Sequence, residues 1–245
     1  MPPSEVIRVF IGYDTRLPVL FNVAQHSIIR HSSRPVAITP IALPHLRHVF
    51  NREKLAIQST EFSFSRFLAP YLCGYEGWAL FIDNDVIIRS DIAELWNLRD
   101  ERFAVQCVKH DHQPKNKVKF LGEAQTAYNK KNWSSVMLMN CGKCRSLTPE
   151  YVNTATGLEL HQFKWLESDS LIGELPLQWN FLVDFYKHDE TAKLVHYTEG
   201  GPYFAGYRNV DFAPDWYDNY RDAASCTDSD YLALTDASRR DAEKP

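Results

Sequence analysis

No apolar run in this sequence approaches the roughly 18 residues that a membrane-spanning helix needs, so we expect no transmembrane segment. The first residues contain neither a basic stretch nor a long apolar stretch, which predicts that there is no signal peptide. Basic residues are not in excess: 27 Lys and Arg stand against 31 Asp and Glu, and this balance argues against a protein that coats nucleic acid. These absences favour a cytoplasmic protein and leave room for peripheral contact with the inner face of a membrane.

Cysteine is also scarce, with five in 245 residues. An odd number of cysteines without a secretion signal indicates reduced thiols. Cys141 and Cys144 form a C-x-x-C pair, but no second pair and no histidine pair at zinc-ligand spacing follows nearby. We interpret these two thiols as packing groups. The alternative is a redox role, which would need the pair at a helix N-terminus just after a strand.

What the sequence does contain is the pattern of one α/β domain. Apolar residues make up 44 %, and short apolar runs alternate with amphipathic stretches, which predicts parallel β-α-β units. The predicted strands are Val6–Tyr13, Val36–Leu43, Trp78–Ile82, Arg102–Val108, Ser135–Asn140 and Lys193–His196. The predicted helices run from a cap at Asp14 to about Arg30, and over Ser63–Leu72, Tyr151–Leu160 and Glu167–Gly173. We expect one domain over residues 1–221 and a polar, flexible tail over residues 222–245.

Two aspartates directly follow the most apolar predicted strand. Asp83 and Asp85 lie between the runs Trp78–Ile82 and Val86–Ile88. About one D-x-D occurs by chance in a chain of this length, and the tail holds another, Asp228-Ser229-Asp230, so the context of the first pair is what matters. Carboxylates at the edge of a core cost several kcal/mol unless they are paired or bind a metal. At the carboxyl end of a strand both can converge on a divalent cation; the alternative is a capped turn that leads into the next helix.

This pair belongs to a longer series of segments that resembles the glycogenin-type glycosyltransferases, a group that includes bacterial lipopolysaccharide galactosyltransferases. The family's patterns are a helix with Arg or Lys, a strand that ends in D-x-D, a D-I-x-E-L-W helix start, N-[AS]-G-V-x-x-x-N, L-P-x-x-[YW]-N and [IV]-H-[FY]. The matching segments are Ser65–Leu72, Trp78–Asp85, Asp91–Trp96, Ser134–Asn140, Leu175–Asn180 and Val195–Tyr197. Their order and spacing hold from about Val6 to Phe204.

The resemblance implies a GT-A fold, which is a Rossmann-like domain with a mixed, mainly parallel sheet flanked by helices. It also implies a nucleotide-sugar donor, foremost a UDP-sugar, and a manganese or magnesium ion held by Asp83, Asp85 and His196. A histidine ligand beside carboxylates suits manganese somewhat better. The other donor-side residues that the resemblance implies are Ile11, Gly12, Tyr13, Asp14, Arg66 and Asn84. The substrate-side residues are Trp133, Ser134, Ser135, Trp179 and Asn180. The alternatives are a core role for His196 and a surface helix cation for Arg66.

The sequence departs from the family pattern in three places, and at one of them Trp133 replaces the family's asparagine before Ser134. After His196 the family's G-x-x-K-P-W has lost its lysine, and we expect the backbone N–H groups of Gly200 and Gly201 to bind phosphate instead. The family's D-Q-D reads Glu167-Ser168-Asp169. Asp169 or Glu167 is a candidate general base if the anomeric configuration is inverted, and a candidate group to stabilise the sugar cation if it is retained. The alternative is an acidic residue placed at a helix N-terminus by the helix dipole.

We therefore expect a metal-dependent glycosyltransferase that moves a sugar to a saccharide, a lipid-linked glycan or another hydroxyl acceptor. The lost lysine and the altered acidic motif motivate an alternative, a nucleotide-sugar-binding protein with little or no turnover. A nucleotidyltransferase is disfavoured because Ile11–Val19 contains no glycine-rich phosphate loop. His110-Asp111-His112, in a basic stretch that extends to Lys119, is expected to be a solvated loop on the acceptor side.

Overall fold

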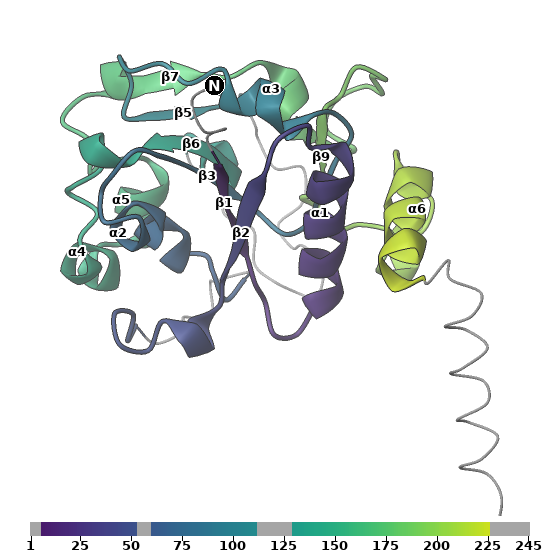
Figure 1. Cartoon of the computed structure of the whole chain (residues 1–245), viewed down its shortest axis with the longest axis horizontal. Coiled ribbons are helices and arrows are strands. Elements are labelled where there is room, and N and C mark those ends of the chain that lie inside the picture. Colours follow the sequence, from purple (N-terminus) through teal and green to yellow (C-terminus); the bar gives the residue numbers. More distant parts are fainter. Residues whose placement is uncertain (1–5, 53–59, 112–128, 226–245) are drawn as a thin grey trace, which may run out of the picture.

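Six strands form the central sheet of the structure, a computed structural model that describes residues 6–52, 60–111 and 129–225 (Figure 1). Their order is β2-β1-β3-β6-β5-β7. The strand β6 is antiparallel to β3 and β5, and the other pairings are parallel, so the sheet is mixed and mainly parallel, as predicted. The bounds are β1 (Ile7–Gly12), β2 (Val36–Ile41), β3 (Trp78–Ile82), β5 (Val105–Cys107), β6 (Val136–Asn140) and β7 (Ile172–Glu174).

A second sheet of three strands, in the order β4-β9-β8, completes the strands of the described residues. Its members are β4 (Val86–Ile88), β8 (Phe181–Leu182) and β9 (Leu194–His196). The strand β4 is antiparallel to β9, and their register places Val86 opposite His196. Because β4 follows β3 after only three residues, the turn that carries Asp83 and Asp85 connects the two sheets.

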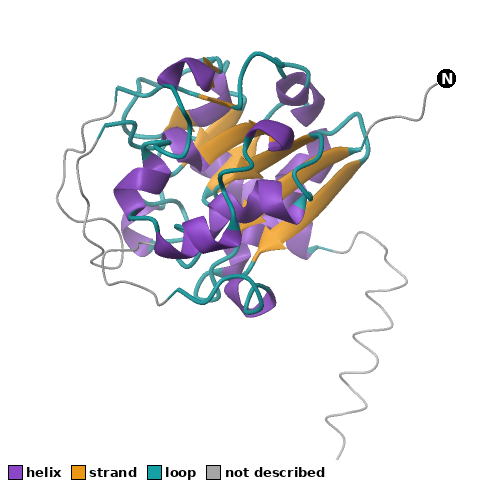
Figure 2. Ribbon diagram, turned by 90° about the vertical axis from the view of Figure 1, so that its left-hand side faces the viewer, coloured by secondary structure: helices purple, strands orange, loops and turns teal. Residues whose placement is uncertain are grey.

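Helices cover both faces of the central sheet, and the strands lie inside them (Figure 2). The helices α2, α4 and α5 lie on one side of the sheet and α1 on the other, with α6 beyond α1 (Figure 1). Within the described ranges, every helix is too short or too polar to cross a membrane. The bounds are α1 (Pro18–His31), α2 (Ala69–Leu72), α3 (Ile92–Trp96), α4 (Pro149–Thr154), α5 (Gly157–His161) and α6 (Ala213–Ala224).

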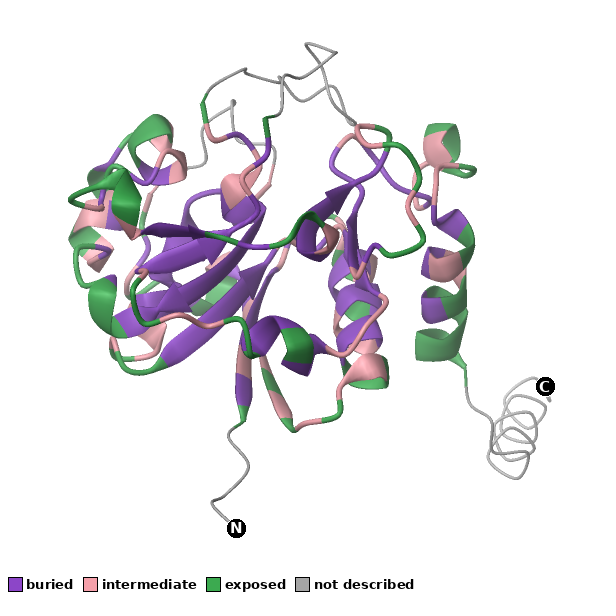
Figure 3. Ribbon diagram, turned by 90° about the horizontal axis from the view of Figure 1, so that it is seen from above, coloured by how far each residue is buried: buried purple, intermediate pink, exposed green. Residues whose placement is uncertain are grey.

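Side chains of the central strands alternate between two hydrophobic cores. On β3, Ala79 and Phe81 pack into the core beneath α2, α4 and α5, while Leu80 and Ile82 pack into the core beneath α1 and α3. All five residues of β3 are buried, as expected for a strand that is covered on both faces. Figure 3 shows that buried residues dominate the interior strands of the molecule. The continuous apolar run seen in the sequence therefore corresponds to a fully buried strand. Asp83, the first polar residue after this run, marks the end of the strand.

Three predicted helices differ from the structure. The prediction over Glu167–Gly173 is wrong, because a single 3-10 turn at Asp169–Leu171 leads into strand β7, which pairs with β5. The segment Tyr151–Leu160 contains α4 and α5, and a capping box at Thr156 starts the second helix. The segment Ser63–Leu72 consists of a 3-10 turn at Ser65–Leu68 followed by α2.

The last described helix, α6, packs against α1. His26 Nδ1 lies 3.2 Å from Asn219 Oδ1, and Arg30 forms an ion pair of 2.7 Å with Asp222. The helix ends at Ala224, three residues beyond the predicted domain boundary at 221. Residues 226–245, which hold Cys226 and the second D-x-D, lie outside the described residues, so the flexible tail stays a prediction.

The C-x-x-C thiols are packing groups, as expected from the sequence. Cys141 and Cys144 are fully buried in the core, and the Cys144 thiol donates to the carbonyl of Ala104 at 3.4 Å. Cys141 also hydrogen-bonds Cys73 in the turn after α2, and this contact lowers the pKa of Cys73 to about 7. Cys141 therefore contacts the thiol of Cys73, which lies outside the C-x-x-C motif. The spacing of the motif alone does not predict this contact.

Candidate active site

The turn that carries the two aspartates is fixed between the two sheets. The N–H of Asp83 donates to the carbonyl of Ser135 at 2.8 Å, next to the pairing of β3 with β6. The carbonyl of Asp85 accepts from the N–H of Tyr197 at 2.9 Å, next to the pairing of β4 with β9. Each end of the turn is therefore anchored in a different sheet, and the two carboxylates lie at the junction.

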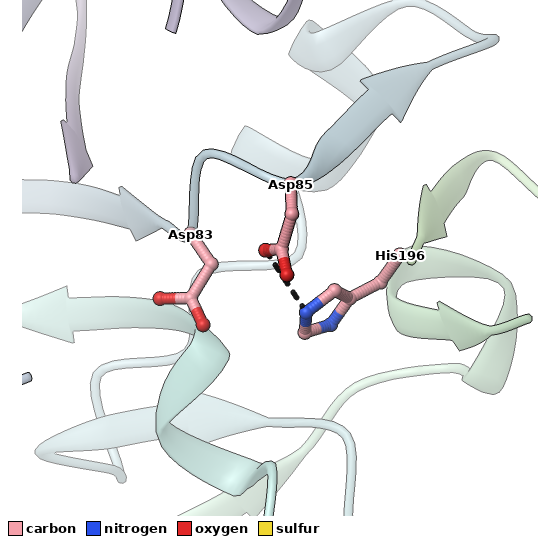
Figure 4. Close-up of side chains that lie close together, drawn as sticks. All are labelled: Asp83, Asp85 and His196. Atoms are coloured by element: carbon pink, nitrogen blue, oxygen red, sulfur yellow. Dashed lines mark ion pairs between the residues drawn. The ribbon is translucent and has the colours of Figure 1, made fainter. Parts of the chain in front are cut away.

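Asp83, Asp85 and His196 come together at this junction (Figure 4). One potential ligand atom from each residue lies within 4.8 Å of the other two, and His196 Nε2 is 3.2 Å from Asp85 Oδ1. Ligands that sit about 2.1–2.5 Å from one hard divalent cation lie at most about 4–5 Å apart. The structure thus brings together the three ligands expected from the resemblance, in a geometry that suits such an ion.

The hydrogen bonds behind His196 define which of its nitrogens faces the aspartates. Asn180 Oδ1 lies 3.0 Å from His196 Nδ1, and Asn180 Nδ2 donates to Ser135 Oγ at 2.8 Å and to the Asn132 carbonyl at 3.3 Å. Because a carbonyl only accepts, the amide NH₂ of Asn180 must face Asn132, and its oxygen must accept from His196 Nδ1–H. Nδ1 is therefore occupied by this hydrogen bond, and Nε2 is the nitrogen that faces Asp85 and is placed to bind a metal, as in metal-binding histidines with an outer hydrogen-bond partner.

Arg66 is a buried member of the site and not a surface cation. Its side chain is 7 % exposed, and its guanidinium contacts Asp83 Oδ1 at 2.7 Å and donates to the Ser134 carbonyl at 3.0 Å. The guanidinium carbon also lies 5.3 Å and 5.1 Å from the ring centroids of Phe62 and Phe81. These contacts hold a permanent positive charge beside the two carboxylates.

Two buried donors at this site lack an acceptor among the described residues. They are Nε of Arg66 and Nδ2 of Asn84, the residue between the two aspartates. A buried donor without an acceptor costs about 1–3 kcal/mol, so such groups are normally satisfied. Carboxylates with an imidazole nitrogen fit a divalent cation, and unpaired donors next to them fit the oxygens of an anion. The residues present therefore fit a metal ion together with a phosphate-bearing ligand.

The residues at the end of β1 are more buried than a role in donor binding would suggest. Ile11 is fully buried in the core, and Gly12 lies against the ring of Phe62, where a Cβ would be 2.3 Å from a ring carbon. The close approach at Gly12 is therefore made by a protein side chain. Tyr13 is half-buried and is the most accessible residue of Ile11–Gly12–Tyr13. The donor-binding role of these residues stays a prediction.

Asp14 is committed to contacts within the protein. Its carboxylate accepts from the backbone and the guanidinium of Arg16 at 2.7–3.0 Å and from the N–H of Glu61 at 3.2 Å. Burial alone would raise the pKa of Asp14, but the hydrogen bonds and charge of Arg16 outweigh it and lower that pKa. Asp14 does not cap α1, which begins at Pro18 after Leu17 without a side-chain cap. Its expected place at the nucleoside also stays a prediction.

Asp169 is paired with a lysine. Its carboxylate accepts from Lys130 Nζ at 2.6 Å, and its side chain is 68 % exposed, as Glu167 is exposed nearby. The hydrogen bond from Lys130 lowers the pKa of Asp169, so this carboxylate is ionised at neutral pH. A general base works best with a pKa near the operating pH. The pairing with Lys130 therefore favours a charge-stabilising role over proton abstraction.

Ser134 forms a contact that sequence patterns gave no signal for. Its hydroxyl lies 2.7 Å from His161 Nδ1, which α5 brings next to the site. Burial, and then the positive charges of Arg66 and Lys131, lower the pKa of His161 to about 3. His161 is therefore neutral at physiological pH. Its Nδ1 therefore accepts a hydrogen bond from the hydroxyl of Ser134. The carbonyl of the same serine accepts a hydrogen bond from Arg66.

This low pKa leads to an expected pH dependence of stability. Between about pH 3 and pH 6.5 the unfolded chain binds a proton at His161 that the folded protein does not, so folding stability falls as the pH is lowered through this window. Urea unfolding at pH 7 and pH 4.5 will show a loss that is roughly 2–3 kcal/mol smaller in His161→Asn, which keeps an acceptor but does not titrate. An identical loss in both proteins would contradict the assignment.

The two tryptophans expected at the substrate lie at different depths. Trp133 is half-buried, and the ammonium nitrogens of Lys109 and Lys130 each lie 5.9 Å from its ring centroid. Trp179 is 2 % exposed within the core under Lys193, and Asn180 is fully buried behind His196. The substrate contact expected of these residues stays a prediction, and Trp133 is the more accessible of the two rings.

Two further expectations differ from the structure. His110 is not a solvated loop residue, because it is 5 % exposed and its Nδ1 lies 2.8 Å from the hydroxyl of Tyr186; His112 lies outside the described residues. The N–H of Gly200 is not available to a phosphate, because it donates to the carbonyl of Tyr197 at 3.0 Å. In both cases a protein group takes the hydrogen bond that we assigned to solvent or ligand.

Several solved glycosyltransferase structures share this architecture. The chain is similar to the apo structure of the bifunctional glycosyltransferase WbbM, with a TM-score of 0.62 and 17 % identity over 89 % of this chain and 50 % of that one. It is similar to apo GlyE of Streptococcus pneumoniae (TM-score 0.59, 14 % identity, 98 % of this chain and 65 % of that chain). It is also similar to the galactosyltransferase LgtC in complex with donor and acceptor sugar analogs (TM-score 0.54, 14 % identity, 91 % and 97 %).

These likenesses show that the chain has the GT-A glycosyltransferase fold that the sequence led us to expect. The chain spans half the length of the WbbM chain and 65 % of the GlyE chain. No family model matches the sequence. Protein CDI of Arabidopsis thaliana is 47 % identical over 222 residues, which cover 87 % of this chain and 85 % of that protein. The chain therefore belongs to the family of Protein CDI.

Proposed function

We propose that this protein is a metal-dependent glycosyltransferase that moves a sugar from a nucleotide-sugar donor, foremost a UDP-sugar, to a hydroxyl of a saccharide or lipid-linked acceptor. The observation that carries the proposal is the gathering of Asp83, Asp85 and His196 within 4.8 Å at the end of a central strand of a GT-A fold. Ligands of open α/β sheets bind at this end of the strands. The cytoplasmic location and the peripheral membrane contact stay predictions.

The three ligands would hold manganese or magnesium, which when bound acts as a Lewis acid on diphosphate oxygens. In the transfer, the bond from the anomeric carbon to the diphosphate breaks, and the diphosphate leaves with the electron pair. The acceptor oxygen forms the new bond to that carbon, and its proton passes to a carboxylate or to the departing diphosphate. Arg66, fixed beside Asp83, stabilises the departing negative charge through charge-assisted hydrogen bonds.

Asp169 has a different part in this proposal. Its ion pair with Lys130 keeps it negatively charged, so it would stabilise the positive charge that develops at the anomeric carbon. Glu167, which is exposed close to it, remains the second candidate for the base of an inverting reaction. The same pairing favours a second function, a nucleotide-sugar-binding protein without turnover, because Asp169 is held by Lys130 in its ionised form and is poorly suited to take up a proton.

One experiment separates the two functions. Protein freed of metal with a chelator is incubated with UDP-sugars and GDP-sugars, with and without MnCl₂, and the released nucleoside diphosphate is measured. We expect manganese-dependent release from at least one UDP-sugar. Tight donor binding by calorimetry without any release would instead support the binding protein, and neither binding nor release would contradict both functions.

A further inference from the structure

A serine and a histidine form a hydrogen-bonded pair one layer behind the candidate metal ligands. Ser134 is 3 % exposed, and its Oγ lies 2.7 Å from Nδ1 of His161, the last residue of α5. The two residues are 27 positions apart in the sequence, so this contact is a tertiary one. A buried hydroxyl is normally paired, and the imidazole supplies the partner of this one.

The segment that carries Arg66 packs against the same imidazole. The rings of Phe64 and Phe67 lie 6.2 Å and 5.3 Å from it, measured between ring centroids. The backbone of Ser63 also hydrogen-bonds the imidazole. Because a neutral imidazole has one donor and one acceptor nitrogen, it can donate to a backbone carbonyl and accept from a hydroxyl at the same time. His161 therefore connects the segment that carries Arg66 with the turn that carries the serine.

These two segments also meet at the guanidinium of Arg66. It donates to the carbonyl of Ser134 at 3.0 Å and contacts Asp83 Oδ1 at 2.7 Å. Asp83 is a candidate metal ligand, so the carbonyl of Ser134 is the partner of this guanidinium that has no part in binding the ion. The position of that carbonyl therefore helps to set the direction of the positive charge beside the two aspartates.

We propose that His161 is a positioning residue. By holding the hydroxyl of Ser134 it fixes the carbonyl of the same serine, and this carbonyl orients the guanidinium of Arg66 toward the diphosphate of the donor. The inference rests on the proposed function, in which Arg66 stabilises the departing diphosphate. His161 acts in this role through Ser134 and Arg66 and takes no direct part in the reaction.

A double-mutant cycle between Ser134 and Arg66 tests this role, with UDP affinity measured by calorimetry in the presence of MnCl₂. Ser134→Ala removes the hydroxyl and keeps the backbone carbonyl, and we expect UDP to bind about three- to tenfold more weakly, the size of one neutral hydrogen bond. In an Arg66→Lys background the same change will alter UDP affinity less than about twofold, because an ammonium lacks the planar fork that the carbonyl orients. Uridine, which has no phosphate, will bind within about twofold of the wild type in every variant.

Variants of the histidine give a second test that does not depend on Arg66→Lys. His161→Asn keeps an acceptor and will bind UDP within about threefold of the wild type, whereas His161→Phe keeps a ring without an acceptor and will reproduce the loss seen in Ser134→Ala. The matched control is Ser27→Ala on α1. It removes an equally buried hydroxyl that donates to the Ala24 carbonyl at 2.7 Å and accepts from the N–H of Ile88 at 3.0 Å. We expect Ser27→Ala to lower stability and to leave UDP affinity unchanged.

Failure of this inference is distinguishable from failure of the proposed function. An equal loss of UDP affinity from Ser134→Ala in both Arg66 backgrounds would overturn the positioning role, because the effect would not pass through the guanidinium. Wild-type UDP affinity in both Ser134→Ala and His161→Phe would overturn it as well. The glycosyltransferase proposal stands in either case. If the wild type binds neither UDP nor GDP with manganese, the proposed function and this inference fail together.

Discussion

Replacing Asp85 with asparagine will abolish manganese-dependent donor cleavage, with an expected loss of about 10²–10⁴-fold in turnover. An ion that acts on the diphosphate contributes several kcal/mol, and each 1.4 kcal/mol corresponds to a factor of ten. Asparagine keeps the size of the side chain but removes the charge that faces His196 Nε2 at 3.2 Å. The measurement is nucleoside diphosphate release at saturating donor, combined with the thermal shift that manganese produces.

The same variant separates metal binding from folding. In metal-free protein, Asp83 and Asp85 repel each other across the site, so Asp85→Asn will unfold at an equal or higher temperature than the wild type. The manganese-induced shift of the wild type will be lost. The matched control is Asp218→Asn, which makes the same chemical change at an exposed residue paired with Arg221. Turnover within tenfold of the wild type in Asp85→Asn would contradict the role of this carboxylate.

The second large effect is expected at Asn180, which hydrogen-bonds the ligand His196 on the side away from the aspartates. Asn180→Ala removes the acceptor that keeps the hydrogen of His196 on Nδ1, and manganese affinity will fall about 10–100-fold, as for outer partners of metal-binding histidines in general. Asn180→Asp keeps an oxygen in the same place and will retain affinity within about tenfold of the wild type. Manganese titration in the presence of UDP, followed by calorimetry, measures both.

A stability control is needed, because Asn180 is fully buried and makes three hydrogen bonds. Asn153 on α4 also makes three, to the N–H of Asn51 and to the carbonyls of Val49 and Pro149. Asn153→Ala will destabilise the protein without changing manganese affinity. If Asn153→Ala weakens manganese binding as much as Asn180→Ala does, the effect comes from loss of stability and not from the orientation of His196.

The fold and the centre of the site follow from the sequence because they depend on short-range patterns. The continuous apolar run Trp78–Ile82 predicts a strand covered on both faces, and the first polar residues after it mark the strand end. His196 entered through the resemblance, and the structure adds the physical reason for its position: the register of β4 with β9 sets it opposite Val86, next to Asp85.

The errors arise where tertiary contacts decide the local structure. Glu167–Gly173 has a helical pattern, but Ile172 begins β7, an edge strand in which it pairs with Val105 of β5. This pairing in the sheet overrides the local helix propensity. Asp14 is a good helix cap by residue type, yet Arg16 and Glu61 take its carboxylate. No pattern in a single sequence specifies which distant side chain will reach a given polar atom.

The same limit explains the residues of the site that the sequence analysis missed or placed differently. Asn180 is predicted to contact the substrate, which stays untested, whereas its hydrogen bond to His196, which depends on the pairing of β8 with β9, was not foreseen. The contact of His161 with Ser134 has no local signature in the sequence either. Each depends on two segments that are brought together only by the complete fold.

Ligation of manganese by His196 is the central claim, and pulsed electron paramagnetic resonance of Mn²⁺ bound together with UDP measures it directly. The imidazole nitrogen of a ligating histidine gives a ¹⁴N modulation of the electron spin echo. We expect this modulation in the wild type and its loss in His196→Ala, whereas His188→Ala, a change at an exposed histidine, will keep it. A spectrum without ¹⁴N modulation in the wild type, or one that is unchanged in His196→Ala, would contradict the proposed metal site.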